Sequence, residues 1–200
     1  MRLFVALEVP AAVKQAAAEV MGRLKGAGGE VKWVRPEGMH LTLKFLGETD
    51  RSLVPELCRA LEAACRGRGA LSLKLAGCGA FPGVRSPRVV WLGLGGELEE
   101  LAGLAAAVEE ALVGLGFPPE SRPFRPHLTL GRVRSGRRGR RGGGKPSAAP
   151  LGRAVAELAR WRGPAFRAES VVLMQSTLTP AGAVYRPLHT TTLERRGTES

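Results

Sequence analysis

The sequence predicts an α+β protein in which a β-α-β-α-β unit occurs twice, so that two antiparallel sheets face each other across a central cleft. One observation behind this prediction is that the tetrapeptide His-Leu-Thr-Leu occurs twice, at 40–43 and at 127–130. Another is that apolar segments typical of strands alternate with longer segments of helical periodicity. We expect a bilobal, pseudo-symmetric duplication within one domain of 200 residues, with halves at about 1–83 and 88–193.

The spacing of the two tetrapeptides is shared by the strands that open the two halves. His40 and His127 are 87 residues apart. The same offset added to Phe4, in the first apolar segment, gives Trp91 in the segment Arg-Val-Val-Trp-Leu-Gly-Leu. This shared offset favours one site built from two equivalent halves.

The first half is predicted from its helix boundaries and its alternating strands. Pro10 ends the first strand and suits the first turn of the helix that follows. Asp50 or Ser52 can cap the second helix through its side-chain oxygen. The predicted strands are 2–9, 31–34, 39–46 and 71–78, and the predicted helices are 11–25 and 53–65.

The second half follows the same order but contains a long basic insertion. Between Val133 and the next helix the chain is a low-complexity loop at about 134–146, made mainly of arginine and glycine, which cannot contribute to a core. The predicted strands of this half are 88–94, 127–133, 166–178 and 185–193, and the predicted helices are 97–115 and 148–161.

The composition indicates a folded protein with an uneven charge. Hydrophobic residues make up 44% of the chain, and the net charge is +12. Between Arg122 and Arg167 there are 13 Arg or Lys residues against the single Glu157, so this segment holds the whole excess. Such a patch is typical of a protein that binds a polyanion, and nucleic acid is the commonest such partner. No stretch is apolar enough to span a membrane, and we expect a cytoplasmic monomer.

Metal and disulfide chemistry are not expected. Cys58, Cys65 and Cys78 are odd in number and form no Cys-x-x-Cys pair, so they are interpreted as reduced, packed thiols. Two histidines without neighbouring carboxylates make a poor metal site, and Asp50 is the only aspartate. We therefore expect no metal and no cofactor. The absence of Asn and the presence of only two Gln residues fit a thermophile, although a GC-rich genome would give the same bias.

The repeated tetrapeptide supplies groups for acid-base chemistry. In a strand, His40 and Thr42 share one face while the leucines face the core, and His127 and Thr129 repeat this arrangement. Histidines with an unperturbed pKa near 6.5 can hold one neutral and one protonated form at neutral pH. Threonine hydroxyls beside them are suited to the non-bridging oxygens of a phosphate.

These residues carry a family resemblance. The segments HLTLKFLG at 40–47 and HLTLGRV at 127–133 resemble the paired HxTx motifs of the two-histidine phosphoesterase superfamily. The segments RLFVALEVP, KWVRPEGMHLTLKFLG and FRPHLTLGRV are similar to the LigT-like group, the RNA 2′,3′-cyclic phosphodiesterases also called 2′-5′ RNA ligases. The resemblance covers the chain except the basic loop.

The resemblance implies an activity and a role for each motif residue. It implies metal-independent opening of an RNA 2′,3′-cyclic phosphate, on ends such as those of tRNA fragments, to a 2′-phosphomonoester, with possible 2′-5′ ligation as the reverse reaction. His127 would be the proton acceptor that activates water, and His40 the proton donor to the leaving 3′-oxygen. Thr42 and Thr129 would hold the phosphate.

Further substrate contacts are predicted around the two motifs. Arg125 and Arg132 could bind phosphates bidentately, although a regular strand would place Arg132 on the face opposite His127. Aromatic side chains could stack on bases, but core packing is the competing interpretation for each of them. These aromatic candidates are Phe45, Phe124 and Tyr185.

Two other interpretations stay open at this point. His189 also precedes a threonine by two residues, but it lacks the alternating leucines and is interpreted as an ordinary strand or surface histidine. The whole chain could instead be a non-catalytic RNA-binding protein that acts through the Arg-rich segment 122–167, with incidental histidines.

Overall fold

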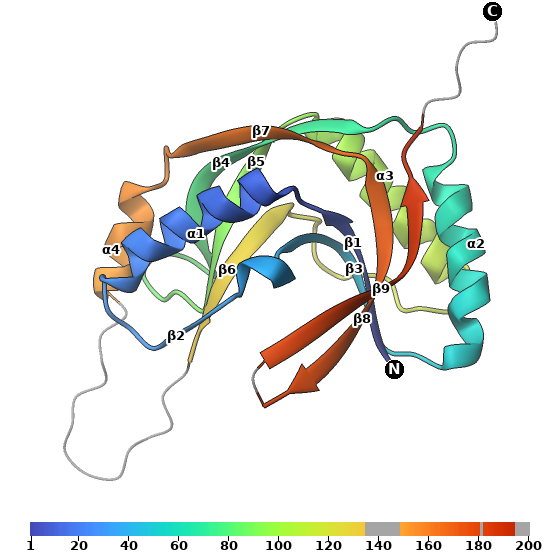
Figure 1. The fold of residues 1–200 in the computed structure, drawn as a ribbon, viewed down its shortest axis with the longest axis horizontal. Helices are drawn as coiled ribbons and strands as arrows, with labels where there is room; N and C mark the ends of the chain where they lie inside the picture. Colours follow the sequence, from blue (N-terminus) through green and yellow to red (C-terminus); the bar gives the residue numbers. More distant parts are fainter. Residues whose placement is uncertain (135–148, 181, 195–200) are drawn as a thin grey trace, which may run out of the picture.

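The computed structural model describes residues 1–134, 149–180 and 182–194 (Figure 1). Its strands are β1 (Arg2–Glu8), β2 (Val31–Trp33), β3 (His40–Glu48), β4 (Leu71–Phe81), β5 (Val89–Gly96), β6 (His127–Val133), β7 (Arg162–Ala168), β8 (Ser170–Thr179) and β9 (Gly182–Thr192). Its helices are α1 (Ala11–Lys25), α2 (Val54–Cys65), α3 (Leu98–Val113) and α4 (Ala149–Glu157), with short 3-10 turns η1 (Pro36–Gly38) and η2 (Arg51–Leu53).

The strands form one strongly curled antiparallel sheet. Their order is β7-β4-β5-β6-β3-β1-β8-β9, and β2 pairs with β6 beside this path. The α+β class is confirmed, but the prediction of two separate sheets was wrong. The two His strands are joined through the pair Leu41 and Leu128, which makes the two half-sheets continuous. The physical reason is that two separate sheets would each leave an edge of unpaired backbone groups at the centre of the molecule.

Each half-sheet takes strands from both of the predicted halves of the chain. One half-sheet is β3-β1-β8-β9 and the other is β6-β5-β4-β7. Thus β4, which lies within 1–83, pairs with β5 and β7, whereas β8 and β9 from the C-terminal end extend the sheet beyond β1. Each half-sheet is likewise covered by one helix from each half of the sequence. Helices α2 and α3 pack on the first half-sheet, and α1 and α4 pack on the second (Figure 1).

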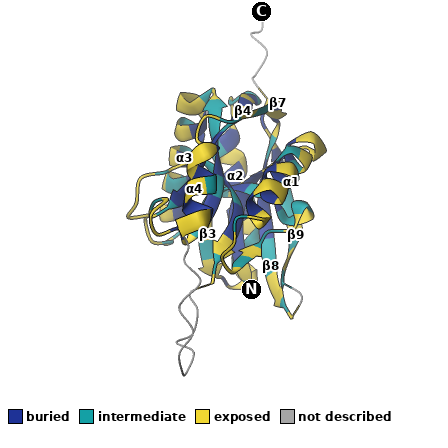
Figure 2. Cartoon of the chain, turned by 90° about the vertical axis from the view of Figure 1, so that its left-hand side faces the viewer, coloured by how far each residue is buried: buried dark blue, intermediate teal, exposed yellow. Residues whose placement is uncertain are grey.

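The sheet has a helix face and a histidine face. The helix face carries the main core, which includes Leu3, Val5 and Leu7 of β1 and the apolar faces of the helices. The histidine face, which carries His40 and His127, has only a small apolar cluster of Phe4, Ala6, Val172 and Met174, with Tyr185 packed against it. Figure 2 shows the buried strands between helices whose outer surfaces are exposed. Within the described residues, no helix is long and apolar enough to cross a membrane.

Two local features differ from the pattern expected from the sequence. The predicted strand 166–178 is broken at Glu169 into β7 and β8, which join opposite ends of the sheet. The opening strands are related by an offset of 85 rather than 87 residues, because Leu7 pairs with Leu41 and Leu92 pairs with Leu128. An error of two residues preserves the face on which each side chain lies, so the periodicity alone could not reveal it.

Candidate active site

The two HxT motifs meet at the join between the half-sheets. Leu41 of β3 is paired with Leu128 of β6 in antiparallel register. Extending this register by one residue in each direction places His40 opposite Thr129 and Thr42 opposite His127. The two histidines are then diagonal neighbours on one face, a relation that separates Cα atoms by about 7–8 Å in a regular antiparallel pair. That spacing leaves room for a small group such as a phosphate between the rings.

His40 is oriented by a backbone hydrogen bond and two aromatic rings. Its Nδ1 lies 2.8 Å from the carbonyl oxygen of Gly38. Because a carbonyl can only accept, Nδ1 carries the proton, and Nε2 offers its lone pair. The ring centroid of Phe4 is 4.6 Å away, and Tyr185 makes an edge contact at 5.0 Å. These contacts hold the imidazole in one orientation on the histidine face.

His127 is held in the same way. Its Nδ1 donates a hydrogen bond to the carbonyl oxygen of Arg125 at 2.7 Å, again two residues earlier in the chain. Phe81 contacts the ring edge-on, with centroids 5.1 Å apart, and the Trp91 ring lies at 6.4 Å. Both histidines therefore have the same tautomer, with Nε2 available as a proton acceptor.

Burial makes both imidazoles weaker bases than free histidine. It lowers the pKa of His40 from 6.5 to about 4, an effect that the hydrogen bond to Gly38 opposes and the nearby ammonium of Lys14 strengthens. Burial also lowers the pKa of His127, and the charge of Arg132 adds to the effect. In the free protein burial therefore favours the neutral form of both imidazoles.

The threonines lie beside the histidines and precede a bulge in each strand. Thr42 and Thr129 are half-buried, and neither hydroxyl makes a hydrogen bond within the described part of the chain. The neighbours Ala6 and Val5 pair with Thr42 and Lys44, so β3 has one extra residue between these two partners. In the same way Trp91 and Val90 pair with Thr129 and Gly131, so β6 has one extra residue between them. Each bulge directly follows the threonine, so the strict alternation of the motif ends there.

The bulge in β6 corrects the predicted position of Arg132. Beyond the bulge Arg132 pairs with Val89, which is two residues from Trp91 on β5 and so lies on the same face. Its side chain is exposed on the histidine face, not on the opposite face as a regular strand requires. Lys32 of β2 is its cross-strand neighbour and is also exposed. The charge of Arg132 acts on His127, and the charge of Lys14, on α1, acts on His40. Glu8 lies opposite His40 in the register of β1 and β3.

The other predicted contact residues differ in how they relate to the site. Phe45 is opposite Phe4, lies 5.9 Å from it between centroids, and is 63% exposed. Tyr185 packs against His40, whereas Phe124 packs against the helix-face core. Arg125 contributes its carbonyl oxygen to His127, and its side chain is exposed.

His189 is placed away from the two motifs. It pairs with Leu173 of β8, which belongs to the helix-face core, and its Nε2 lies 3.1 Å from a carboxylate oxygen of Glu62 on α2. The distance is that of an ion pair, but the geometry is not that of an aligned hydrogen bond, because Nε2 has no hydrogen-bond partner. The structure agrees with the interpretation of His189 as an ordinary strand histidine.

Comparisons with known proteins give the family. The family described as LigT like phosphoesterase matches residues 7–91 and 94–185. The chain belongs to this family. It is 36% identical over 188 residues to the RNA 2′,3′-cyclic phosphodiesterase of Archaeoglobus fulgidus, covering 94% of this chain and 98% of that one. It is 32% identical over 184 residues to the enzyme of the same name from Methanothermobacter thermautotrophicus, covering 92% and 94%.

Solved structures agree with the fold of this LigT-like phosphoesterase. The crystal structure of TT0787 of Thermus thermophilus superposes with a TM-score of 0.72 at 30% identity, covering 96% of this chain and 98% of that one. E. coli LigT complexed with 3′-AMP superposes with a TM-score of 0.69 at 23% identity, covering 96% and 97%. The family resemblance predicted from the two motifs is confirmed.

On the helix face, a partly buried ion pair connects β3 of this LigT-like protein to the segment that leads to β6. Lys44, which follows the bulge in β3 and is 6% exposed, donates to both carboxylate oxygens of Glu109 on α3 at 2.8 and 2.7 Å. It also donates to the carbonyl oxygen of Pro118, in the segment that leads to β6, at 2.9 Å. Glu109 in turn accepts from the backbone N–H of Glu120. The sequence pattern did not predict this contact, since a Lys after a strand motif is usually solvated.

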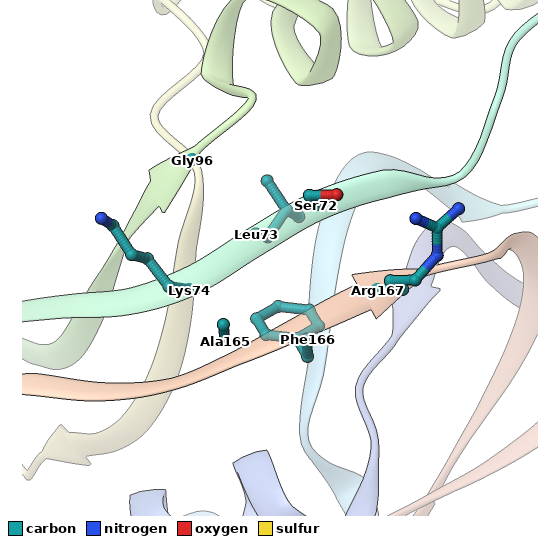
Figure 3. Close-up of a pocket in the computed structure, with 7 residues that line it drawn as sticks. All are labelled: Ser72, Leu73, Lys74, Gly96, Ala165, Phe166 and Arg167. Carbon is teal, nitrogen blue, oxygen red and sulfur yellow. The ribbon is translucent and has the colours of Figure 1, made fainter.

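One pocket of the described structure lies apart from the two motifs. A shallow pocket of about 450 Å³ lies over β4 and β7, and its lining includes Ser72, Lys74, Phe166 and Arg167 (Figure 3). Neither motif histidine lines it, so it is not where the acid-base pair lies. Among the described residues, no group of three or more His, Cys, Asp or Glu side chains could hold a metal ion.

Proposed function

We propose that this LigT-like phosphoesterase is an RNA 2′,3′-cyclic phosphodiesterase that hydrolyses the cyclic end to a 2′-phosphomonoester. The observation that supports the proposal is the pairing of Leu41 with Leu128, which brings the two HxT motifs together where the half-sheets join. The relatives that bear this enzyme's name match nearly the whole chain.

The proposed reaction uses the two Nε2 atoms as acid and base. Nε2 of His127 takes a proton from water, and the oxygen of that water bonds to phosphorus. The bond between phosphorus and O3′ breaks, and His40 gives its Nε2 proton to O3′, which leaves the phosphate on O2′. Hydroxyls of Thr42 and Thr129, with the guanidinium of Arg132, would bind the non-bridging oxygens. Which histidine is the acid rests on the family resemblance.

The acid must gain its proton in the presence of substrate. In the free protein, burial keeps the pKa of His40 at about 4. A cyclic phosphate carries one negative charge, and an anion between the rings favours the imidazolium form and raises the pKa of the histidine beside it. Ligation would use the same site, with the 5′-hydroxyl of a second RNA in the place of water.

Phosphorus NMR of a nucleoside 2′,3′-cyclic phosphate tests the reaction. The wild-type protein should give the 2′-phosphate alone, in buffer containing EDTA as in buffer without it. His40→Ala and His127→Ala should each lower the rate by about 10²- to 10⁴-fold, the usual contribution of a general acid or base. His189→Ala is the matched control, because it removes a histidine on the helix face, and it should keep the wild-type rate.

The same assay separates the enzyme from the alternative function. A non-catalytic RNA-binding protein would show no turnover of the cyclic phosphate. Robust turnover by both His40→Ala and His127→Ala would contradict the acid-base proposal. The Arg-rich segment supports RNA binding by its charge, although residues 135–148 lie outside the described residues. Deleting 134–145 should therefore weaken RNA binding and its salt dependence, while turnover of a mononucleotide substrate continues.

We also propose that the two halves are a duplication. The strand orders β3-β1-β8-β9 and β6-β5-β4-β7 correspond, and both histidines bond the carbonyl two residues earlier. Superposing one half-sheet on the other should bring His40 onto His127, and a best superposition that leaves them apart would refute the duplication. The cytoplasmic location and the monomeric state stay predictions, the second of which sedimentation equilibrium would test.

A further inference from the structure

Trp91 lies next to the proposed catalytic pair on the histidine face. It is opposite Thr129 in the register of β5 and β6. Its ring centroid is 6.4 Å from that of His127, and the ring of Phe81 is 5.1 Å away at an angle of 37°. Trp91 therefore lies beside Thr129, and Phe81, whose ring centroid is 5.1 Å from that of His127, lies beside the histidine of the same motif.

The indole rests on a surface of glycines. Its six-membered ring covers Gly79 of β4 so closely that a Cβ on Gly79 would collide with Cη2 and Cζ2 of the ring. A Cβ on Gly93 would come within 3.4 Å of Cζ3. Because these two neighbours have no side chains, the indole can lie over the backbone of the sheet, and its other surface is turned away from the sheet.

The other two tryptophans are used differently. Trp33 and Trp161 are packed against the helix-face core. Trp161 also covers a glycine, Gly163, but it does so on the side of Leu75, which is a core residue. Trp91 belongs neither to that core nor to the Phe4 cluster, and it is only half-buried. With Phe81 it forms a pair of aromatic rings beside His127 that belongs to neither apolar cluster.

The first half has no such ring at the corresponding position. The residue opposite Thr42 is Ala6, which is fully buried within the Phe4 cluster. On that side Phe4 and Tyr185 pack directly on His40. Phe45, the exposed ring of the first half, lies opposite Phe4, three residues beyond Thr42, so the position directly opposite the motif threonine carries an aromatic ring in the second half and an alanine in the first.

We propose that Trp91 is the stacking surface for the nucleobase of the nucleotide that carries the cyclic phosphate. This inference rests on the proposed function, since it takes the phosphate to lie between the two His-Thr pairs. Phe81 would extend the surface beyond the indole. Stacking on an indole tolerates any base, because every base has a π face. The site therefore recognises the presence of a nucleobase rather than its identity.

A pair of substrates with and without a base tests the inference. Trp91→Leu should raise the KM for a nucleoside 2′,3′-cyclic phosphate by about 5- to 150-fold, the loss expected from removing one base-stacking contact. For 1-O-methylribose 2,3-cyclic phosphate, which has no base, the increase in KM should be several-fold smaller. The ratio of the two KM values, rather than either value, is the measurement.

Trp161→Leu is the matched control for the loss of an indole over a glycine. It should lower the melting temperature without changing the ratio of the two KM values. An equal increase in KM for both substrates in Trp91→Leu would overturn the inference and assign Trp91 a structural role. Similar preference for all four nucleobases in the wild-type protein would support it.

Failure of the proposed function would be visible in a different result. In that case the wild-type protein would turn over neither substrate. Stacking can then be measured by titrating cytidine 2′-phosphate and following tryptophan fluorescence. Quenching in the wild type that is lost in Trp91→Leu and retained in Trp161→Leu would support the stacking surface, and quenching that is unchanged in Trp91→Leu would overturn it.

Discussion

Acid should destabilise this protein partly through His40. Burial holds the pKa of His40 at about 4 in the folded protein, whereas an exposed histidine in the unfolded chain has a pKa of 6.5. The folded state therefore binds this proton less readily than the unfolded state. The contribution to stability is complete above pH 6.5 and is lost as the pH falls from 6.5 to about 4.

The size of the effect follows from the two pKa values. Each unit of difference corresponds to about 1.4 kcal/mol, so the whole interval corresponds to about 3 kcal/mol. His40→Gln keeps a polar side chain that does not titrate and should remove this part of the loss. Carboxylates with a lowered pKa, such as those of Glu109 and Asp50, also make the fold less stable in acid. They are present in the wild type and in His40→Gln alike, so they do not contribute to the difference between the two proteins.

Guanidinium denaturation at several pH values between about 7.5 and 4.5 measures the difference. The free energy of unfolding of the wild type should fall more steeply over this interval than that of His40→Gln, by about 2–3 kcal/mol. His127→Gln should flatten the same limb in the same direction, since burial also lowers the pKa of His127. Parallel curves for the wild type and His40→Gln would refute the reasoning that His40 is buried as a neutral imidazole.

Two further predictions concern groups on the helix face. Glu109→Gln should lower the free energy of unfolding by about 3 kcal/mol, because it leaves the buried ammonium of Lys44 without its counter-charge. Lys44→Met should lower the free energy of unfolding by less in the same denaturation experiment, because the carboxylate of Glu109 is 29% exposed and stays hydrated without its partner. A larger loss for Lys44→Met than for Glu109→Gln would contradict this account. A thiol reagent at about pH 8 should modify Cys58 first. Burial raises the pKa of all three thiols, to about 11 for Cys65 and Cys78, but Cys58 alone is partly exposed, and mass spectrometry of the native protein would show the order.

The alternation of the sequence predicted the central feature of the site. A period of two places His40 with Thr42 and His127 with Thr129, and the structure keeps both pairs on one face. Most elements were also predicted, because Pro10 and the glycine clusters act locally on the backbone. The predicted cap was misplaced: Asp50 accepts a hydrogen bond from the backbone N–H of Ser52 and caps the 3-10 turn η2, whereas α2 begins at Val54 after Leu53 without a side-chain cap.

What the sequence could not predict depends on long-range pairing. A bulge after each threonine depends on the partner strand, so the sequence alone could not show that Arg132 lies on the histidine face. The lowered pKa values depend on what covers each imidazole, such as Phe4 and Tyr185 over His40. Trp91 was seen only as a strand residue, since its place on Gly79 needs the register of β4 and β5.

The exchange of strands between the half-sheets has a consequence for how the chain folds. β1 pairs on one side with β3 and on the other with β8, where Leu7 meets Val171. A ribosome releases β1 first, yet β1 stays without one of its two partners until almost all of the chain has been made. Pairings across such sequence separations are slow to form, because a long loop must close before they contribute. The half-sheet that contains β1 and β3 is therefore completed after the one that contains β5 and β6, and the strand that begins with His40 becomes part of a complete sheet only when the last strands arrive.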